Sequence, residues 1–279
     1  MTRERPRQPI DLTRGLHLIK NDFELEFMGR RAKELLENLD EAIAATQKLA
    51  PKGNKRYKLG GVFGEARLRL ASEWLAGQNL QEKHWEQALW DQRSTIRGEG
   101  AAGMWTEVIG FQELLRDSMR PGDKSTNSGW GEIDLLGISE FGLPVVIELK
   151  SNKRQKLLHA LIEAVAYGIA IRKAWPNLAE QWRSRVAELK LNLPTPSLDR
   201  LESCPLVVAA PDYYWELQNR SSNQKHCTDQ PFPDFWNPFH KLRAALAARG
   251  LPVTFLELKR SATGRLSAGK AMLPPFQET

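Results

Sequence analysis

The sequence predicts an α/β protein in which helices cover a central mixed sheet, with an N-terminal helical extension. Two observations carry this expectation. Apolar residues recur at helical spacing through much of the first hundred residues, whereas strand-like apolar runs alternate with helical segments after the glycines at 98, 100 and 103. Such alternation is typical of an α/β sandwich. The chain has 279 residues, of which 41% are hydrophobic, so it is long enough to bury a substantial core.

Three helices are expected before these glycines. The first covers residues 28–49, where apolar side chains recur every three or four positions, and it ends near Pro51. The second covers Phe63–Leu75 and is stopped by Gly77. The third covers Leu80–Gln92.

The later part of the chain alternates helices and strands. A helix is expected over Met104–Met119, because its apolar residues fall on one helical face. Two strands follow, Glu132–Ile138 and Pro144–Leu149, and their short glycine-containing connection predicts an antiparallel hairpin. Residues 155–173 are apolar nearly all round, which predicts a helix buried against the sheet. The remaining expected elements are a strand at Pro205–Ala210, a helix at Phe239–Arg249 and a strand at Val253–Leu258.

Composition narrows the class of protein. No apolar run approaches the ~20 residues that a membrane helix needs, and the first residues, MTRERPRQP, lack the apolar stretch of a signal peptide. The two cysteines, Cys204 and Cys227, form no metal-ligand pattern and suit a reducing compartment. Ordinary core packing is their expected role. We therefore expect a cytoplasmic protein with no membrane partner.

The net charge of +6 is unevenly distributed along the chain. Residues 101–149 carry three basic and eight acidic side chains, whereas residues 51–70, 150–156 and 241–279 have net charges of +5, +4 and +5. Solvated surface charge is the usual explanation of such runs. The alternative is a cluster of metal-binding carboxylates inside a phosphate-binding surface. Charge alone does not choose between the two.

Three chemically distinctive side chains lie in the expected hairpin. Glu148 and Lys150 project from one face at the end of the second strand, and Asp134 in the first strand can lie opposite them. Carboxylate oxygens bind Mg²⁺, which neutralises a phosphate and acidifies a bound water. A lysine beside the metal can position or deprotonate the attacking water. These residue types in this arrangement favour phosphodiester hydrolysis.

With Asp134, Glu148 and Lys150 in this order, the chain resembles the PD-(D/E)xK nuclease superfamily, which has the restriction-endonuclease-like fold. The resemblance covers roughly residues 103–260. It implies an αβββαβ core around a mixed sheet and a Mg²⁺-dependent endodeoxyribonuclease that leaves a 5′-phosphate. It also implies that Asp134 and Glu148 bind Mg²⁺, or Mn²⁺, together with the Leu149 carbonyl, and that Lys150 orients the attacking water.

The resemblance points to further residues outside the two strand ends. Members often carry an acidic residue on the helix before the hairpin; Glu107 is the matching position here, with Glu113 as a rival. Ile133 precedes Asp134 where the family motif has proline, a departure that many members share. RecB-type nucleases have a Gln-x-x-x-Tyr motif on the helix after the lysine, and this chain has Glu163 and Tyr167 there. The replaced glutamine leaves membership of the RecB subgroup open.

Several residues near the site have two interpretations each. Glu132 is either a further ligand or a surface residue, and Glu163, on an apolar helix, needs either the metal site or Lys150 as a partner. A group of basic residues follows the site and either holds the substrate backbone or forms a solvated turn. These residues are Lys153, Arg154 and Lys156. Tyr213–Trp215 follow a strand end, where they either stack on bases or pack in the core.

A second Glu-x-Lys sequence shows that the motif alone is weak. Glu257-Leu258-Lys259 also ends an expected strand, but a helix precedes it rather than a hairpin that carries a carboxylate. We interpret this second copy as a decoy.

The main hypothesis is a metal-dependent nuclease acting on nucleic acid, which in this family is DNA more often than RNA. Bacterial genome defence, mobile-element and repair roles are all compatible with it. Residues 101–279 then form the nuclease-like domain, and residues 1–100 give specificity, homodimerisation or binding to a protein partner. One alternative is a non-catalytic nucleic-acid-binding or assembly module that reuses the fold. Another is a helical interaction protein whose basic segment, residues 51–70, contacts an acidic partner.

Overall fold

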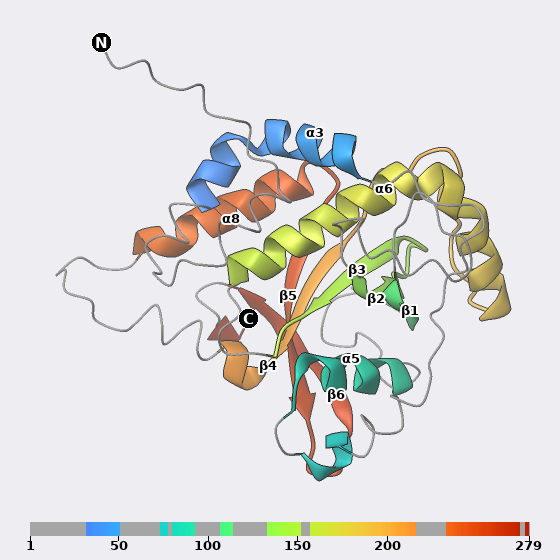
Figure 1. Ribbon diagram of the computed structural model, residues 1–279, viewed down its shortest axis with the longest axis vertical. Coiled ribbons are helices and arrows are strands. Elements are labelled where there is room, and N and C mark those ends of the chain that lie inside the picture. Colours follow the sequence, from blue (N-terminus) through green and yellow to red (C-terminus); the bar gives the residue numbers. More distant parts are fainter. Residues whose placement is uncertain are drawn as a thin grey trace.

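The computed structural model describes residues 32–50, 73–77, 80–92, 107–113, 133–151, 157–215, 233–273 and 277–278. Its elements, in chain order, are α3 (Leu39–Leu49), α5 (Glu82–Asp91), β1 (Glu107–Glu113), β2 (Ile133–Ile138), β3 (Pro144–Leu149), α6 (Leu157–Glu188), β4 (Leu206–Pro211), α8 (Pro233–Ala247), β5 (Val253–Arg260), β6 (Leu266–Leu273) and β7 (Gln277–Glu278). The expectation of an α/β protein with a mixed sheet is therefore confirmed (Figure 1).

One sheet of seven strands organises the described residues, and its strands are neighbours in chain order. β1, β2 and β3 form an antiparallel meander. β3, β4 and β5 are parallel, because α6 and α8 carry the chain back between successive strands. β5, β6 and β7 are antiparallel again. The carboxyl ends of β3 and β4 therefore lie side by side at one end of the sheet.

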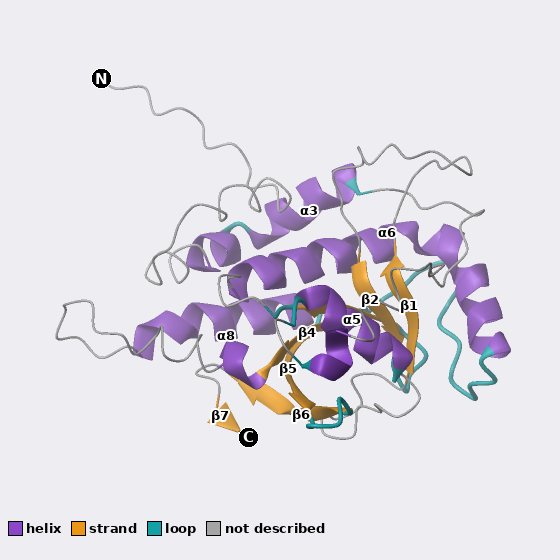
Figure 2. Ribbon diagram, turned by 60° about the horizontal axis from the view of Figure 1, so that its bottom comes forward, coloured by secondary structure: helices purple, strands orange, loops and turns teal. Residues whose placement is uncertain are grey.

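Helices cover both faces of this sheet. Figure 1 shows α3, α6 and α8 on one face and α5 on the other, and Figure 2 shows α5 lying across the strands from the second side. Each face has its own apolar cluster. Val146 and Leu206 pack with α6 on the first face, whereas Trp85 and Leu89 of α5 pack with Ile147 on the second. α5 therefore shares a core with the hairpin, although the resemblance leaves it outside the predicted nuclease-like domain.

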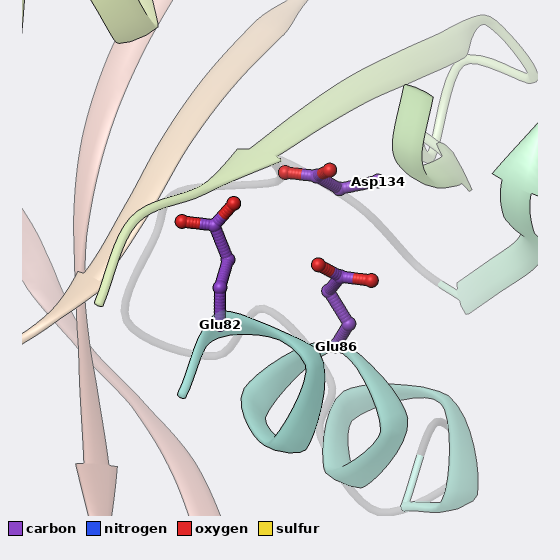
Figure 3. Close-up of side chains that lie close together, drawn as sticks. All are labelled: Glu82, Glu86 and Asp134. Carbon is purple, nitrogen blue, oxygen red and sulfur yellow. The ribbon is translucent and has the colours of Figure 1, made fainter. Parts of the chain in front are cut away.

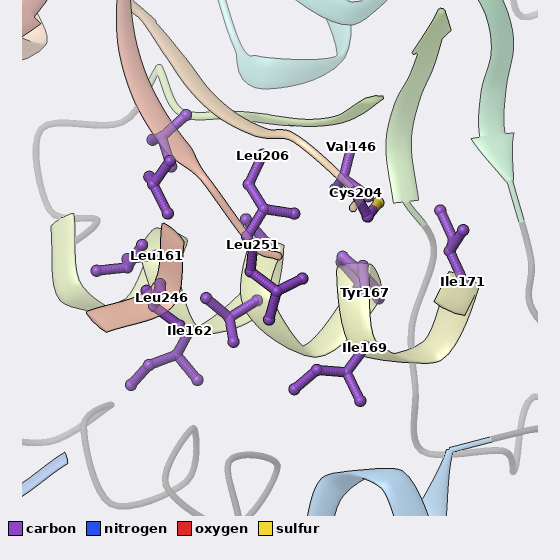
Figure 4. Packing of buried hydrophobic residues seen from close by; sticks show 14 of the residues in the cluster. Val146, Leu161, Ile162, Tyr167, Ile169, Ile171, Cys204, Leu206, Leu246 and Leu251 are labelled. Carbon is purple, nitrogen blue, oxygen red and sulfur yellow. The ribbon is translucent and has the colours of Figure 1, made fainter. Parts of the chain in front are cut away.

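The first half of α6 is apolar nearly all round because it is buried between the sheet and the other helices. Figure 4 shows Leu161, Ile162 and Tyr167 of this helix among the side chains of the first cluster. The helix approaches the sheet closely at Gly168, where an added Cβ would lie 2.6 Å from Leu206 Cδ2. A larger residue there would force the side chains of Leu206 and Leu251 to move.

The same helix is longer than the sequence predicts. It continues past residue 173 and through Pro176 to Glu188, although a proline inside a helix removes one backbone hydrogen bond. Buried contacts on the far side of the proline maintain it, because Trp182 packs in the core and its Nε1 donates a 2.9 Å hydrogen bond to the Gly142 carbonyl. Tertiary packing outweighs the local preference at this point.

The helix expected over Met104–Met119 is wrong for the part that the structure describes, because Glu107–Glu113 form strand β1. β1 pairs with β2, with a register shift between Val108 and Gly110. An extra residue in a strand can bring apolar residues three positions apart onto one face, which is also the spacing of a helix. The spacing alone therefore does not distinguish the two structures. Pairing with β1 satisfies the backbone groups on the outer edge of β2, which a helix would leave exposed. Strands β6 and β7 were not predicted either.

The hairpin prediction is confirmed. β2 and β3 are antiparallel, with Leu135 opposite Ile147. The connection between them contains Gly142, whose φ is +74°. A Cβ at this position would lie 1.8 Å from the Pro194 carbonyl oxygen. The turn therefore requires glycine both for its backbone conformation and for space.

Two expectations about the class of protein also concern described residues. None of the described helices has both the length and the apolar character needed to cross a membrane. Cys204 is fully buried in the first apolar cluster, as ordinary packing requires, and burial raises the pKa of its thiol to about 12. Cys227 lies outside the described residues.

Candidate active site

The structure brings Asp134, Glu148 and Lys150 together at the ends of β2 and β3. The antiparallel register of the hairpin, continued by one step, places Asp134 across from Glu148. The backbone N–H of Leu149 donates a 2.7 Å hydrogen bond to Asp134 Oδ2, and Lys150 Nζ donates one of 2.5 Å to Glu148 Oε1. Two carboxyl groups and one ammonium thus meet at the end of an apolar hairpin.

Backbone contacts with β4 hold this strand end in place. The Lys150 N–H donates a 3.0 Å hydrogen bond to the Ala209 carbonyl, and the Tyr213 hydroxyl donates one of 3.0 Å to the Ser151 carbonyl. Glu148 and Lys150 are only 3% and 4% exposed. Their side chains are therefore enclosed by the protein on a fixed backbone, which limits the positions that they can adopt.

α5 supplies two more carboxylates from the opposite side. Glu82 and Glu86 are four residues apart on this helix and therefore share a face, and that face is turned toward Asp134 (Figure 3). Carboxylate oxygens of the three residues lie within 4.8 Å of one another, so the triad can hold a metal ion. Glu82 Oε1 is also 3.6 Å from Lys150 Nζ. The triad and the lysine therefore form one continuous site.

α6 contributes a third side to the site. Glu163 Oε2 lies 3.2 Å from Lys150 Nζ, and Glu163 Oε1 lies 3.2 Å from His159 Nε2. Of the two partners that the sequence leaves open for Glu163, the described geometry therefore provides the lysine. Tyr167, one turn further along, is buried in the first apolar cluster, and burial raises its pKa. Glu163 thus joins the lysine to a histidine that is 18% exposed.

Burial determines the acid–base behaviour of the central residues. It raises the pKa of Asp134 and of Glu148 well above the usual carboxyl range, and repulsion between neighbouring carboxylates adds to the effect. Burial also disfavours the charge on Lys150, but the surrounding carboxylates outweigh it and raise the pKa of the ammonium. Glu163 is the exception: its pKa falls to about 2, because hydrogen bonding from His159 and the charge of Lys150 outweigh its burial.

The site holds more carboxyl groups than cationic groups. Glu82, Glu148 and Glu163 contact the ammonium of Lys150, and Asp134 and Glu86 complete the triad with Glu82. Glu82 Oε2 and Glu148 Oε2 are among the buried carboxylate oxygens that have no hydrogen-bond partner among the described residues. Unpartnered buried oxygens are costly, and a set made only of oxygen donors suits a hard divalent cation. The residues present therefore fit a metal such as Mg²⁺ or Mn²⁺, although nothing in the donor set selects one metal.

Sequence reasoning missed Glu82 and Glu86. A signal was available, because α5 carries two acidic residues at i and i+4 next to Trp85 and Leu89, which mark the same helix as buried. An acidic pair on a helix with buried neighbours requires either partners or a cation. The helix itself was predicted, but its carboxylates were not connected with a hairpin more than 40 residues later.

The structure also corrects the setting of Glu107, which begins strand β1 and does not lie on a helix before the hairpin. The side chains of Glu107 and Glu113 are outside the described part of the chain. So are Glu132 and the three basic residues that follow the site, Lys153, Arg154 and Lys156. The suggested roles of these residues stay predictions.

No protein-family model, curated protein or solved structure matches this chain. The chemistry of the site and the arrangement of the elements that form it are therefore the basis for a function.

Proposed function

We propose that this protein is a metal-dependent nuclease of the PD-(D/E)xK type that hydrolyses phosphodiester bonds in DNA. The observation that carries the proposal is the contact of Lys150 with Glu148 and Glu82, beside a carboxylate triad that can hold a metal ion. Hydrolysis of a phosphodiester requires charge neutralisation of the phosphate, an activated water and a group that orients that water. The site contains residues suited to each task.

Each residue has a distinct role in the proposed reaction. Asp134, Glu82 and Glu86 would hold the cation, with Glu148 as a further oxygen donor. The cation, when bound, supplies Lewis acidity to the phosphate and to a water molecule. Lys150 donates hydrogen bonds to the attacking water and fixes its direction toward phosphorus. The burial of Glu148 and Lys150 excludes bulk water, which strengthens these electrostatic interactions.

The order of the elements also supports the proposal. The resemblance implies an αβββαβ core, and the chain contains α5, β1, β2, β3, α6 and β4 in that order. The helix that precedes the three strands is α5, so its carboxylates, Glu82 and Glu86, take the role that the sequence assigned to Glu107. β3 and β4 are parallel neighbours, and ligands commonly bind outside the carboxyl ends of such strands.

The proposal includes a polyanionic partner, DNA, and cytoplasmic action. The basic segments at 51–70 and 150–156 flank the acidic residues of the site in the sequence. Basic segments of this kind favour binding to the phosphate backbone of nucleic acid. Binding of this kind weakens as the salt concentration rises, whether or not cleavage follows.

The test is cleavage of plasmid and single-stranded DNA by the purified full chain in Mg²⁺ and in EDTA. Wild type is expected to cut in Mg²⁺ and to be inactive in EDTA. Asp134→Asn is expected to lose activity, whereas Asp199→Asn, a change at an exposed loop residue, is expected to keep it. Equal cutting by wild type and Asp134→Asn would reveal a contaminating nuclease and overturn the proposal. A salt-dependent gel shift without cleavage would favour the non-catalytic binding module instead.

A further inference from the structure

Tyr214 is a fully buried residue with a polar atom that the described part of the chain leaves unpaired. It follows β4 in a short helical turn formed by residues 212–215 and is 0% exposed. Its hydroxyl has no hydrogen-bond partner among the described residues. Phenylalanine would fill the same space without the cost of burying an unpaired hydroxyl. An unsatisfied buried group of this kind calls for an explanation, and one explanation is a ligand that is not part of the protein.

The neighbours of Tyr214 in the sequence have partners for their polar atoms. The Tyr213 hydroxyl donates to the Ser151 carbonyl at 3.0 Å. Trp215 Nε1 donates to the Ala210 carbonyl at 2.9 Å. The Tyr214 ring packs edge-on against Trp215, with ring centroids 5.1 Å apart and an interplanar angle of 87°. The ring is therefore fixed by packing while its hydroxyl is left unpaired.

The position of Tyr214 connects it with the candidate active site. Leu149 and Ala209 are paired across the parallel strands β3 and β4, so the residues after β4 lie beside those after β3. The charges of Lys150, Glu82 and Glu148 all act on the Tyr214 phenol, and burial raises its pKa. The hydroxyl therefore stays protonated and is available as a hydrogen-bond donor next to the site.

We propose that the Tyr214 hydroxyl donates a hydrogen bond to a phosphoryl oxygen of the bound nucleic acid. The inference rests on the proposed nuclease function and adds a substrate-contacting residue to it. A neutral donor suits this place, because it binds an anionic oxygen without adding a charge to a site already crowded with carboxylates. The fixed ring aims the hydroxyl before the substrate arrives, so little ordering is needed during the reaction.

The test compares Tyr214→Phe with wild type in cleavage, in DNA binding with Ca²⁺ and in thermal stability. Cleavage in Mg²⁺ is expected to show kcat/KM lowered by about 10- to 100-fold. Affinity for a short oligonucleotide in Ca²⁺ is expected to fall by roughly 2- to 10-fold, as for the loss of one neutral hydrogen bond. The melting temperature is expected to equal or exceed that of wild type, since the variant loses only an unpaired hydroxyl.

Tyr213→Phe is the matched control for stability. It removes the same atom from the neighbouring tyrosine, but that hydroxyl is bonded to Ser151, so its melting temperature is expected to fall. A Tyr214→Phe variant that cuts and binds like wild type would overturn the inference and leave the nuclease proposal intact. A Tyr214→Phe variant with a lowered melting temperature would show that the hydroxyl has a structural partner, which also overturns it. If wild type cuts nothing, the nuclease proposal fails. If Tyr214→Phe then also binds the oligonucleotide as tightly as wild type does, the inference about Tyr214 is overturned as well.

Discussion

The chain contains the sequence Glu-Leu-Lys three times, once at the end of α6 and twice on parallel strands of one sheet. The two copies on the strands have very different surroundings. Glu148 and Lys150 follow the hairpin at the end of β3, with side chains 3% and 4% exposed and a 2.5 Å contact between them. Glu257 and Lys259 lie on β5, with side chains 12% and 54% exposed and a 3.0 Å contact. Both copies form an ion pair between the same residue types, so the pair itself does not make a site.

The difference lies in what faces each pair. Glu148 and Lys150 are enclosed by carboxylates from α5 and α6. Glu257 instead lies against the neighbouring strand, where a Cβ added to Gly269 would be 2.5 Å from Glu257 Oε2. The first copy is therefore an ion pair surrounded by further carboxyl groups. The second copy packs against the neighbouring strand, β6. Elements distant in sequence determine which copy can do chemistry.

The largest expected effect comes from removing the two lysines in turn. Lys150→Ala is expected to lower the cleavage rate by about 10³-fold, because the attacking water loses the group that orients it. Lys259→Ala is expected to leave the rate within about twofold of wild type, since its ammonium is half exposed. Plasmid cleavage rates in Mg²⁺, with folding checked by circular dichroism, provide the measurement. Equal losses in the two variants would remove the distinction between the copies.

The next effect concerns metal binding. Glu86→Gln removes one carboxylate of the triad and is expected to weaken Mg²⁺ binding by at least about tenfold. Glu257→Gln removes a carboxylate outside the triad and is expected to bind Mg²⁺ like wild type. Isothermal titration calorimetry with each purified variant measures the affinity. If Glu86→Gln binds Mg²⁺ as tightly as wild type does, the cation is held elsewhere.

A smaller effect is expected on stability as a function of pH in EDTA. The pKa values of Asp134 and Glu148 are raised in the folded chain. At pH values above the usual pKa range of carboxyl groups, the folded chain therefore binds more protons than the unfolded chain. The stability that these groups provide is therefore lost as pH rises from that range through their folded-state pKa values. The lowered pKa of Glu163 matters only at more acidic pH, and the raised pKa of Lys150 only at more alkaline pH.

Wild type in EDTA is accordingly expected to melt at a higher temperature at pH 6 than at pH 8, by at least about 3 °C. Glu148→Gln removes one of the buried carboxyl groups and is expected to reduce this difference, while Glu257→Gln is expected to keep it. Differential scanning calorimetry at the two pH values checks the expectation. A higher melting temperature at pH 8 would mean that the buried carboxyl groups are better compensated in the metal-free protein than their surroundings indicate.

The elements with strong local patterns were predictable from the sequence. The hairpin and the strands β4 and β5 follow from apolar runs next to glycine or proline, and α6 follows from a segment that is apolar nearly all round. β1 was not, because its register shift after Val108 gives its apolar residues a spacing that also fits a helix. The last turns of α6 were not predicted, because packing of Trp182 continues the helix beyond Pro176. Local patterns fail where tertiary contacts decide the outcome.

The residues of the candidate active site also fall into a group that was predictable from the sequence and a group that was not. Asp134, Glu148 and Lys150 were found because strand alternation and a short hairpin place them together. Glu82 and Glu86 were not, because no local pattern indicates which face of the sheet α5 will cover. Their contact with Asp134 is a property of the packing of α5 on the hairpin. Charge density along the chain located the acidic hairpin, but it could not identify the helix that completes the triad.

The smallest expected effect is the coupling between the two residues of the second copy. A double-mutant cycle with Glu257→Gln and Lys259→Ala is expected to give a coupling free energy of about 0.5 kcal/mol, as for other partly exposed ion pairs. The coupling is expected to diminish in about 1 M salt, because solvent ions reach the half-exposed ammonium of Lys259. Urea unfolding of the wild type, the two single variants and the double variant provides the four free energies of unfolding. A coupling above about 2 kcal/mol that persists in salt would place Glu257 in a low-dielectric environment comparable to that of Glu148. The second copy would then be a buried ion pair in its own right, and enclosure by α5 and α6 would no longer explain why the first copy alone is proposed to act on phosphate.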